Sequence, residues 1–307
     1  MCESGKHLTK TRAIMDFRKK FIVEPHVKFK LGNIDPSYKG THESHESAAA
    51  ELALHTASLA QLQLRLYAEG KRSLLIVLQG LDAAGKDGVI RHVISGTNPQ
   101  GVNVAGFKQP THEELAHDFL WRAHNHTPAK GEIMIFNRSH YEDVLSVRVH
   151  DVVPKSVWSE RYGRICEFEK LLIQAGTHVI KFYLHISPEE QLARFKTRLD
   201  DPHRNWKISD SDYTEREYWP AYIEAYEDAM SETSTTHAPW YVIPSNHKWF
   251  RDLVISQILV ETLDEMDLKI PKPSVDLKAI RLQYHSAKIE QEKNQRLDAH
   301  PDERKKQ

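Results

Sequence analysis

The stretch that decides the fold is Ser73-Leu-Leu-Ile-Val-Leu-Gln-Gly-Leu-Asp-Ala-Ala-Gly-Lys-Asp87. It opens with an apolar run typical of a buried strand and leads into a helical pattern that begins at Asp87. Between the two stands Gly80-x-x-x-x-Gly85-Lys86, which is the spacing of a phosphate-binding loop. Glycines let such a loop curl until its N–H groups point at phosphate oxygens, and the lysine adds a mobile positive charge. The stretch predicts phosphate contacts from Gly80, Ala83, Ala84, Gly85, Lys86, Asp87 and Gly88.

One position departs from the usual loop pattern, because the Ser or Thr expected after the lysine is Asp87. That hydroxyl normally binds magnesium, so the standard ligand is missing. The carboxylates of Asp82 and Asp87 are the candidates to hold the cation, which we expect to be Mg²⁺ with Mn²⁺ as the alternative. A glycine-rich turn that only connects strand and helix is the other interpretation, and the flanking strand and helix argue against it.

Four further apolar runs alternate with helical segments along the chain. They cover residues 102–107, 132–136, 178–186 and 240–243, so that together with 73–79 the sequence predicts five strands. Parallel strands need crossover connections, which the intervening helices provide. The pattern therefore predicts an α/β fold with helices on both faces of a parallel sheet and a ligand at the carboxyl ends of the strands.

Composition divides the chain into three parts. Residues 1–45 mix basic residues with Pro and Gly and predict an arm with little regular structure. Residues 46–266 form the core, which begins with an amphipathic helix closed by Gly70. A polar insertion at about 188–239 within this core is too long for a plain connection and predicts a lid. Residues 267–307 form a polar tail, whose end is predicted to be disordered in isolation.

A second polar cluster follows the strand predicted at 132–136, in the run Asn137-Arg-Ser-His-Tyr-Glu-Asp143. An ordinary P-loop protein offers Asp directly after this strand, whereas this chain offers Asn137. We predict that Arg138 stabilises charge on a transferring phosphoryl group and that Glu142 holds metal or orients an acceptor phosphate. A strand end that merely carries surface polar residues is the alternative.

Basic residues gather in the insertion. Arg194 and Arg198 lie four residues apart, so they share a helix face and can line a groove. A solvated helix face is the usual explanation for such charges, but the predicted phosphate site nearby favours the groove. The basic residues that we predict to contact substrate are Lys108, Arg148, Arg194, Arg198, Arg204 and Lys207.

Charge and composition exclude several classes of protein. The formal net charge is only −1, which argues against a duplex-DNA binder that relies on a strongly basic surface. No apolar stretch approaches the length of a membrane span, and the first residues lack the pattern of a secretory signal, so we expect a cytoplasmic protein. The 19 histidines show no metal-ligand spacing and are expected to be surface residues.

Three ordered motifs, within about residues 31–263, resemble the second polyphosphate kinase family. They are Gly80-x-Asp-x-x-Gly-Lys-Asp87, Phe136-Asn-Arg-Ser-x-Tyr141, and Arg198 through Asn205-Trp-Lys207. The resemblance implies a P-loop kinase three-layer sandwich similar to thymidylate kinase, with a five-stranded parallel sheet and a helical lid. It also implies magnesium and reversible phosphoryl transfer between inorganic polyphosphate and nucleotides.

The resemblance also implies roles for single residues. Asp82 is similar to a magnesium or phosphate-orienting carboxylate, Lys86 to the P-loop lysine, and Arg138 to the catalytic arginine. Arg198 is similar to a polyphosphate contact. Asn137 and Glu142 resemble the class that phosphorylates nucleoside monophosphates such as AMP as well as diphosphates such as ADP. A neutral amide is a poor ligand for a hard cation, so we assign metal to Asp82 and Glu142.

Two other functions remain open on the sequence. The first is an ATP-dependent nucleoside or nucleotide kinase, which would use the same fold and loop with another donor. The second is a P-loop switch that acts through partners, although so many cations around one ligand argue against it. We expect polyphosphate, AMP, ADP and other nucleotides as partners, without nucleic acid or membrane, in a homo-oligomer.

Overall fold

The computed structural model describes residues 15–299 of the protein. The chain divides into two compact units, Met1–Lys269 and Ile270–Gln307. In the second unit a single helix, α12 (Leu277–Ala299), occupies most of the described residues. The predicted disordered end is therefore helical as far as residue 299, and its last residues, 300–307, lie outside the described part.

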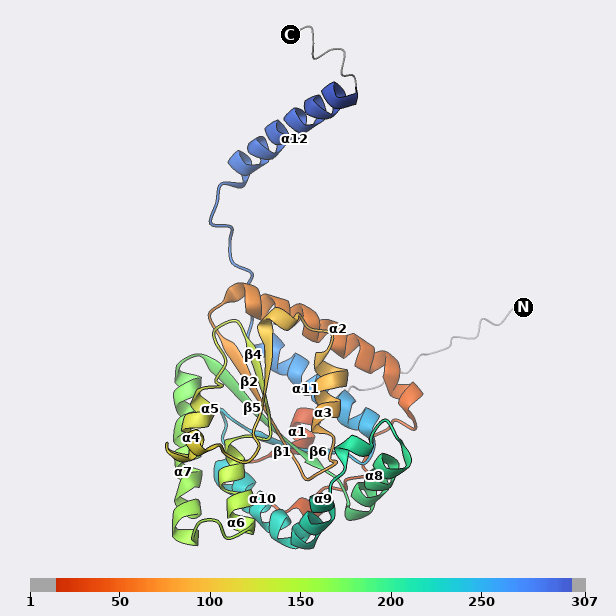
Figure 1. The fold of residues 1–307 in the computed structure, drawn as a ribbon, viewed down its shortest axis with the longest axis vertical. Helices are drawn as coiled ribbons and strands as arrows, with labels where there is room; N and C mark the ends of the chain where they lie inside the picture. The colour runs from red at the N-terminus through yellow and green to blue at the C-terminus, as the bar shows by residue number, and fades with distance from the viewer. Residues whose placement is uncertain (1–14, 300–307) are drawn as a thin grey trace, which may run out of the picture. The chain divides into compact units, whose positions relative to one another are not determined.

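The first unit is built on one twisted sheet with the strand order β1-β6-β5-β2-β4-β3 (Figure 1). Every neighbouring pair in it is parallel except β1 and β6, which run antiparallel. The strands are β1 (Ile22–Val23), β2 (Ser73–Gln79), β3 (Val102–Gly106), β4 (Ile133–Asn137), β5 (Thr177–His185) and β6 (Trp240–Pro244).

The five predicted strands are present as β2 to β6, but the predicted total of five is wrong. The sixth strand, β1, comes from the segment that was expected to be an arm with little regular structure. Asp16 caps the short helix α1 (Phe17–Phe21) by accepting from the Lys19 N–H, and the chain then pairs with β6 through Ile22 and Val23. Apolar residues at 17, 21 and 23 are buried, so this segment belongs to the core.

Helices cover both faces of the sheet, which gives three layers (Figure 1). Alternate residues of β2 face opposite layers, as the two-residue period of a strand requires. Leu74, Ile76 and Leu78 pack with α2 and α11, whereas Leu75 and Val77 pack with α7 and α10. The long helices are α2 (His45–Glu69), α7 (Lys155–Gln174), α10 (Trp219–Thr233) and α11 (Lys248–Glu265).

Short helices surround the carboxyl edge of the sheet, and those between β5 and β6 form the predicted insertion. That insertion contains α8 (Pro188–Asp200), α9 (Asp210–Thr214) and α10, joined by the 3₁₀ turns η5 (Asn205–Lys207) and η6 (Glu215–Tyr218). The remaining short helices are α3 (Lys86–Val89) with the π-helical turn η2 (Ile90–Ile94), α4 (His112–Leu115), α5 (Trp121–His124), the 3₁₀ turn η4 (His140–Asp143) and α6 (Ser146–Val149). Two more 3₁₀ turns, η1 (Leu31–Asn33) and η3 (Pro99–Gly101), lie elsewhere in the first unit.

The chain runs from β2 to β3 and β4 on one side of β2 and then crosses to β5 and β6 on the other side, so the order of the strands reverses at β2. In open α/β sheets the crevice at such a point, outside the carboxyl ends of the strands, is where ligands bind. None of the helices between residues 15 and 299 combines the length and apolar character needed to span a bilayer.

The packing of the amino-terminal segment generates a stability prediction. Phe21 is 2% exposed, and its ring lies 5.8 Å from that of Tyr38 and 6.4 Å from that of Phe250. Phe21→Ala should therefore lower the free energy of unfolding by about 3–5 kcal/mol, measured by urea denaturation. The matched control Leu54→Ala removes a side chain that is 69% exposed and should change stability by less than about 0.5 kcal/mol. A loss below about 1 kcal/mol for Phe21→Ala would mean that this segment is peripheral.

Candidate active site

The loop between β2 and α3 has the backbone of a phosphate-binding loop, and it needs glycine at two positions. Gly85 has a φ of +110°, and a Cβ there would lie 1.9 Å from the Arg251 guanidinium. Gly80 has a φ of +150°, and a Cβ there would lie 3.0 Å from the carbonyl oxygen of Leu184. Gly80 and Ala84 are buried inside the loop, whereas Ala83, Gly85 and Gly88 line the cleft above it.

Lys86 lies inside the loop, as predicted. Its side chain turns back so that Nζ donates to the carbonyl oxygen of Gly80 at 2.6 Å. Burial, followed by the charge of Arg138, lowers the Lys86 pKa to about 8. The Lys86 ammonium group is therefore removed from water, and no carboxylate neutralises it fully. A phosphate that enters the loop would supply the missing negative charge.

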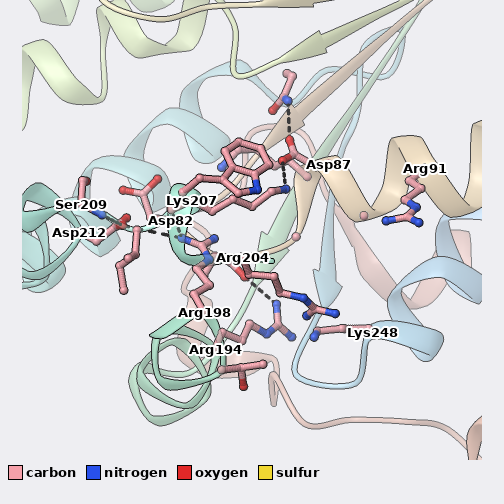
Figure 2. A pocket seen from close by; sticks show the side chains of 18 of the residues that line it. Asp82, Asp87, Arg91, Arg194, Arg198, Arg204, Lys207, Ser209, Asp212 and Lys248 are labelled. Atoms are coloured by element: carbon pink, nitrogen blue, oxygen red, sulfur yellow. Dashed lines mark hydrogen bonds and ion pairs between the residues drawn. The ribbon is translucent and has the colours of Figure 1, made fainter. Parts of the chain in front are cut away.

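A cleft of about 1250 Å³ opens above the loop, and both the core and the insertion line it (Figure 2). Ten Lys and Arg residues line it against four Asp, although the whole chain carries a formal net charge of −1. In Figure 2, Arg194 and Arg204 from the insertion lie on the side of Lys248 of α11, whereas Arg198 points toward Asp212. Such a concentration of positive charge is stable only with solvent or an anionic ligand between its members, so the cleft is suited to a polyanion.

Arg138 is brought to the edge of the cleft with a carboxylate on either side. Its guanidinium lies 2.6 Å from Asp82 Oδ1 and 3.9 Å from Glu142 Oε2. Although burial opposes it, these carboxylates raise the pKa of Arg138 above its ordinary value. Burial raises the pKa of Glu142 as well, because Arg138 and Lys86 only partly compensate its charge. The predicted group of Asp82, Lys86, Arg138 and Glu142 is therefore assembled in one place.

The two departures from the ordinary P-loop pattern contact each other. Asn137, at the end of β4, donates from Nδ2 to Asp87 Oδ1 at 2.9 Å. Lys207, from the insertion, donates to the other oxygen of Asp87 at 3.3 Å. Although burial alone would raise it, the pKa of Asp87 is lowered by these two donors. With both oxygens engaged, Asp87 is a weaker candidate for a cation ligand than Asp82.

The N–H groups of Arg194, which we predicted to contact substrate, have acceptors within the protein. Its Nη1 donates to the carbonyl oxygens of Ala83 and Ala84 at 2.8 and 2.9 Å, and its Nη2 donates to those of Ser245 and Asn246. Its Nε pairs with Glu190 at 2.7 Å. A guanidinium has five N–H groups, so each is matched by a protein acceptor. Arg194 lines the cleft but acts as a brace that joins α8 to the phosphate-binding loop.

Arg198 and Arg204 of the insertion keep some N–H donors for a ligand. Arg198 donates from Nη1 to the carbonyl oxygen of Lys207 at 3.2 Å, which ties α8 to η5, and lies 3.8 Å from Asp212. Arg204 pairs with Asp201 through Nε at 2.8 Å. Both line the cleft, as do Lys207 and, from the segment after β3, Lys108.

Arg148 is a correction to the predicted set. Its guanidinium pairs with Glu224 and Asp228 of α10, at 2.8 Å each, and lies over the ring of Trp158. Among the described residues, those that line the cleft do not include Arg148. Two carboxylates already neutralise its charge, so it joins α6 to α10 and is not placed to bind the ligand of this cleft.

Further basic residues of the cleft, which the sequence motifs did not indicate, come from helices on the other side of the loop. Arg91 and His92 reach the cleft from η2, and Lys248 and Arg251 reach it from the first turn of α11. Burial, followed by the charge of Arg194, lowers the pKa of Lys248. A usable signal was present, because Lys248 and Arg251 are three residues apart directly after the last predicted strand, at the ligand edge of the sheet.

The residues present fit a cation that shares its ligands with a phosphate. Within residues 15–299, no three His, Cys, Asp or Glu side chains are grouped to hold a metal ion by themselves. Mg²⁺ is usually held by one or two carboxylates together with substrate phosphates. Asp82 and Glu142, both beside Arg138 and near the loop, supply that number of carboxylates.

Comparison with known proteins agrees with this geometry. Residues 42–271 match the family Polyphosphate kinase 2 (PPK2). The AMP/ADP-polyphosphate phosphotransferase of Meiothermus ruber is 51% identical over 83% of this chain and 96% of the relative. The ADP-polyphosphate phosphotransferase of Rhodopseudomonas palustris is 43% identical over 83% of this chain and 92% of that protein.

A solved structure has the same architecture. The crystal structure of polyphosphate kinase 2 from Arthrobacter aurescens is similar with a TM-score of 0.84 at 41% sequence identity, and the match covers 87% of this chain and 96% of that one. The family match, these relatives and the three motifs lead to one conclusion: the chain belongs to the polyphosphate kinase 2 family.

Proposed function

We propose that the protein transfers a phosphoryl group reversibly between inorganic polyphosphate and nucleoside mono- or diphosphates, converting AMP and ADP to ADP and ATP. The observation that carries the proposal is the cleft lined by ten basic and four acidic residues directly above Lys86. Polyphosphate presents repeated anionic units and no base, so a run of Lys and Arg side chains is its fitting receptor. The names of the relatives from Meiothermus ruber and Rhodopseudomonas palustris support the same activity.

The chemistry requires positioning and charge neutralisation more than proton transfer. Both donor and acceptor are phosphates, so the attacking oxygen is already an anion and no strong base has to remove its proton. Lys86 and Arg138 would neutralise negative charge on the phosphoryl group during its transfer, and the N–H groups of the loop would orient that phosphoryl group. The brace formed by Arg194 keeps the loop in that orientation.

Magnesium fits this scheme as a resident cofactor, held by Asp82 and Glu142, and Mn²⁺ is the alternative. When bound, the cation neutralises phosphate oxygens and brings donor and acceptor together. Asp82 already accepts a hydrogen bond from Arg138, so its carboxylate would be shared between the Arg138 guanidinium and the cation. The raised pKa of Glu142 reflects a carboxylate whose charge is incompletely compensated, which a cation would correct.

We propose that the insertion from α8 to α10 acts as a lid. Arg198, Arg204 and Lys207 face the loop across the cleft, and Lys207 already contacts it through Asp87. Closing such a segment on the substrate would exclude water, which otherwise competes as the phosphoryl acceptor. The Lys207 to Asp87 contact is exposed, so it contributes about 1 kcal/mol or less and a polyanion can displace it.

The main alternative is an ATP-dependent nucleotide kinase, which differs from the proposed enzyme in taking its phosphoryl group from ATP instead of polyphosphate. With purified polyphosphate, AMP and magnesium but no ATP, the enzyme should form ADP and ATP. Lys86→Met and Asp82→Asn should each lower that rate by about 100-fold or more with the fold intact, as followed by circular dichroism. The control Lys130→Met changes an exposed lysine outside the cleft and should keep the full rate. No product without ATP would refute the proposal.

A second prediction concerns pH and the Lys86 ammonium group. Because its pKa is about 8, the charged form that binds phosphate is lost as the pH rises through that value. The kcat/KM for polyphosphate should therefore fall above pH 8, approaching tenfold per unit. Lys86→Arg should remove this decline whatever its absolute rate, since Arg stays charged. Lys248→Met should retain the decline, and an unchanged profile in Lys86→Arg would show that another group titrates.

A third prediction concerns Glu142 and the choice of acceptor. A carboxylate that helps to hold a cation near the acceptor compensates for the shorter, less charged phosphate of a monophosphate. Glu142→Asn should lower kcat/KM for AMP about tenfold more than for ADP, which corresponds to about 1.4 kcal/mol. The control Glu113→Asn changes an exposed carboxylate on α4 and should leave the ratio unchanged. A parallel fall for both acceptors would assign Glu142 a general role.

A further inference from the structure

A lysine and a glutamate form a buried ion pair beneath the loop that carries Arg138. Lys181 lies in the middle of β5, and its Nζ is 2.5 Å from Glu169 Oε2 of α7. Their side chains are 0% and 2% exposed. Removing two charges from water costs several kcal/mol per ion, so such a pair adds little net stability compared with apolar side chains of similar size. Lys181 lies between apolar neighbours in the centre of β5, and its presence there calls for another function.

Tyr141 connects this ion pair to the loop that carries Arg138. Its hydroxyl accepts from Lys181 Nζ at 3.0 Å and lies 2.9 Å from Glu169 Oε1, to which it donates. The Tyr141 side chain is fully buried and stands directly before Glu142, three residues after Arg138. Hydrogen bonds to ionised groups are shorter and stronger than neutral ones, so the two charges hold the tyrosine firmly.

The loop needs such an anchor because its backbone is strained. Arg138 has a φ of +61°, in the left-handed region that residues other than glycine rarely adopt. A conformation of this kind costs about 1 kcal/mol or more and persists only where the surroundings impose it. The Arg138 N–H donates to the carbonyl oxygen of Leu78, which fixes one end of the loop to β2. Tyr141 fixes the other end to β5 and α7.

The same pair also holds the end of the insertion. The carbonyl oxygen of Thr233, the last residue of α10, accepts from Lys181 Nζ at 2.9 Å. The Thr233 hydroxyl oxygen lies 3.0 Å from the Tyr141 hydroxyl and accepts from Trp240 Nε1 at 2.9 Å. The root of the insertion and the loop that carries Arg138 are therefore attached to one ammonium group.

We infer that Lys181, Glu169 and Tyr141 are positioning residues for phosphoryl transfer. They hold Arg138 and Glu142 at a fixed place relative to Lys86, and they fix the point from which the insertion extends. The inference rests on the proposed function, since it needs Arg138 and Glu142 to act on the substrate. Because the network is buried and does not line the cleft, it changes the turnover of bound substrate and leaves substrate affinity nearly unchanged.

The first test removes one oxygen atom. Tyr141→Phe should lower kcat about tenfold or more, with KM values for polyphosphate and AMP within about twofold of the wild type. The matched control Tyr241→Phe removes the hydroxyl of another buried tyrosine, on β6, whose oxygen accepts from Arg18. That control should keep its kcat. In an Arg138→Ala background, Tyr141→Phe should cause a smaller further loss than it does in the wild type, because part of its effect passes through Arg138.

The second test separates positioning from stability. The double variant Lys181→Met with Glu169→Leu replaces the charges by apolar groups of similar size, which buried pairs often tolerate without loss of stability. It should unfold cooperatively near the wild-type melting temperature, yet its kcat should be as low as that of Tyr141→Phe. A wild-type kcat in either Tyr141→Phe or the folded double variant would overturn the inference, and Tyr141→Phe decides alone if the double variant does not fold. A wild type that is inactive with polyphosphate would instead refute the proposed function.

Discussion

The active site depends on the guanidinium of Arg194, whose N–H groups are shared among three segments. It binds the carbonyl oxygens of Ala83 and Ala84 in the phosphate-binding loop and those of Ser245 and Asn246 after β6. A trans peptide points its C=O and N–H in opposite directions, so the contact with Ala84 also sets the direction of the next N–H in the loop. One side chain thus fixes the loop, the insertion and the entry to α11 relative to one another.

The cleft and the buried network distribute charge in opposite ways. In the cleft, positive charges exceed negative ones and the balance has to come from a ligand. Beneath the loop that carries Arg138, Lys181 and Glu169 form an ion pair that is buried away from water, and each neutralises the charge of the other. The first arrangement selects an anionic substrate, and the second holds a strained backbone in place. A buried cluster of like charges could not anchor the loop in this way, because the charges would repel one another.

Local features could be predicted from the sequence, and features set by tertiary contacts could not. The loop from Gly80 to Lys86 and the five strands β2 to β6 follow from spacing and apolar runs, which are properties of neighbouring residues. The strand β1 was missed because two residues give no periodicity, and its place depends on pairing with β6. Arg194 was predicted as a ligand contact from the helix face that it shares with Arg198, and Arg148 was predicted as part of the same basic set. Their partners within the protein, backbone carbonyls for Arg194 and the carboxylates of α10 for Arg148, come from distant parts of the chain.

The contact between Asp87 and Asn137 has an evolutionary consequence. An ordinary P-loop protein has a hydroxyl at the first position and a carboxylate at the second, whereas this chain has a carboxylate and an amide, 2.9 Å apart. A change to Asp at 137 alone would set two carboxylates side by side, and a change to Ser at 87 alone would deprive both Asn137 and Lys207 of their acceptor. Each single change would therefore remove a contact that this chain has. We expect the two positions to vary together among descendants of a common ancestor.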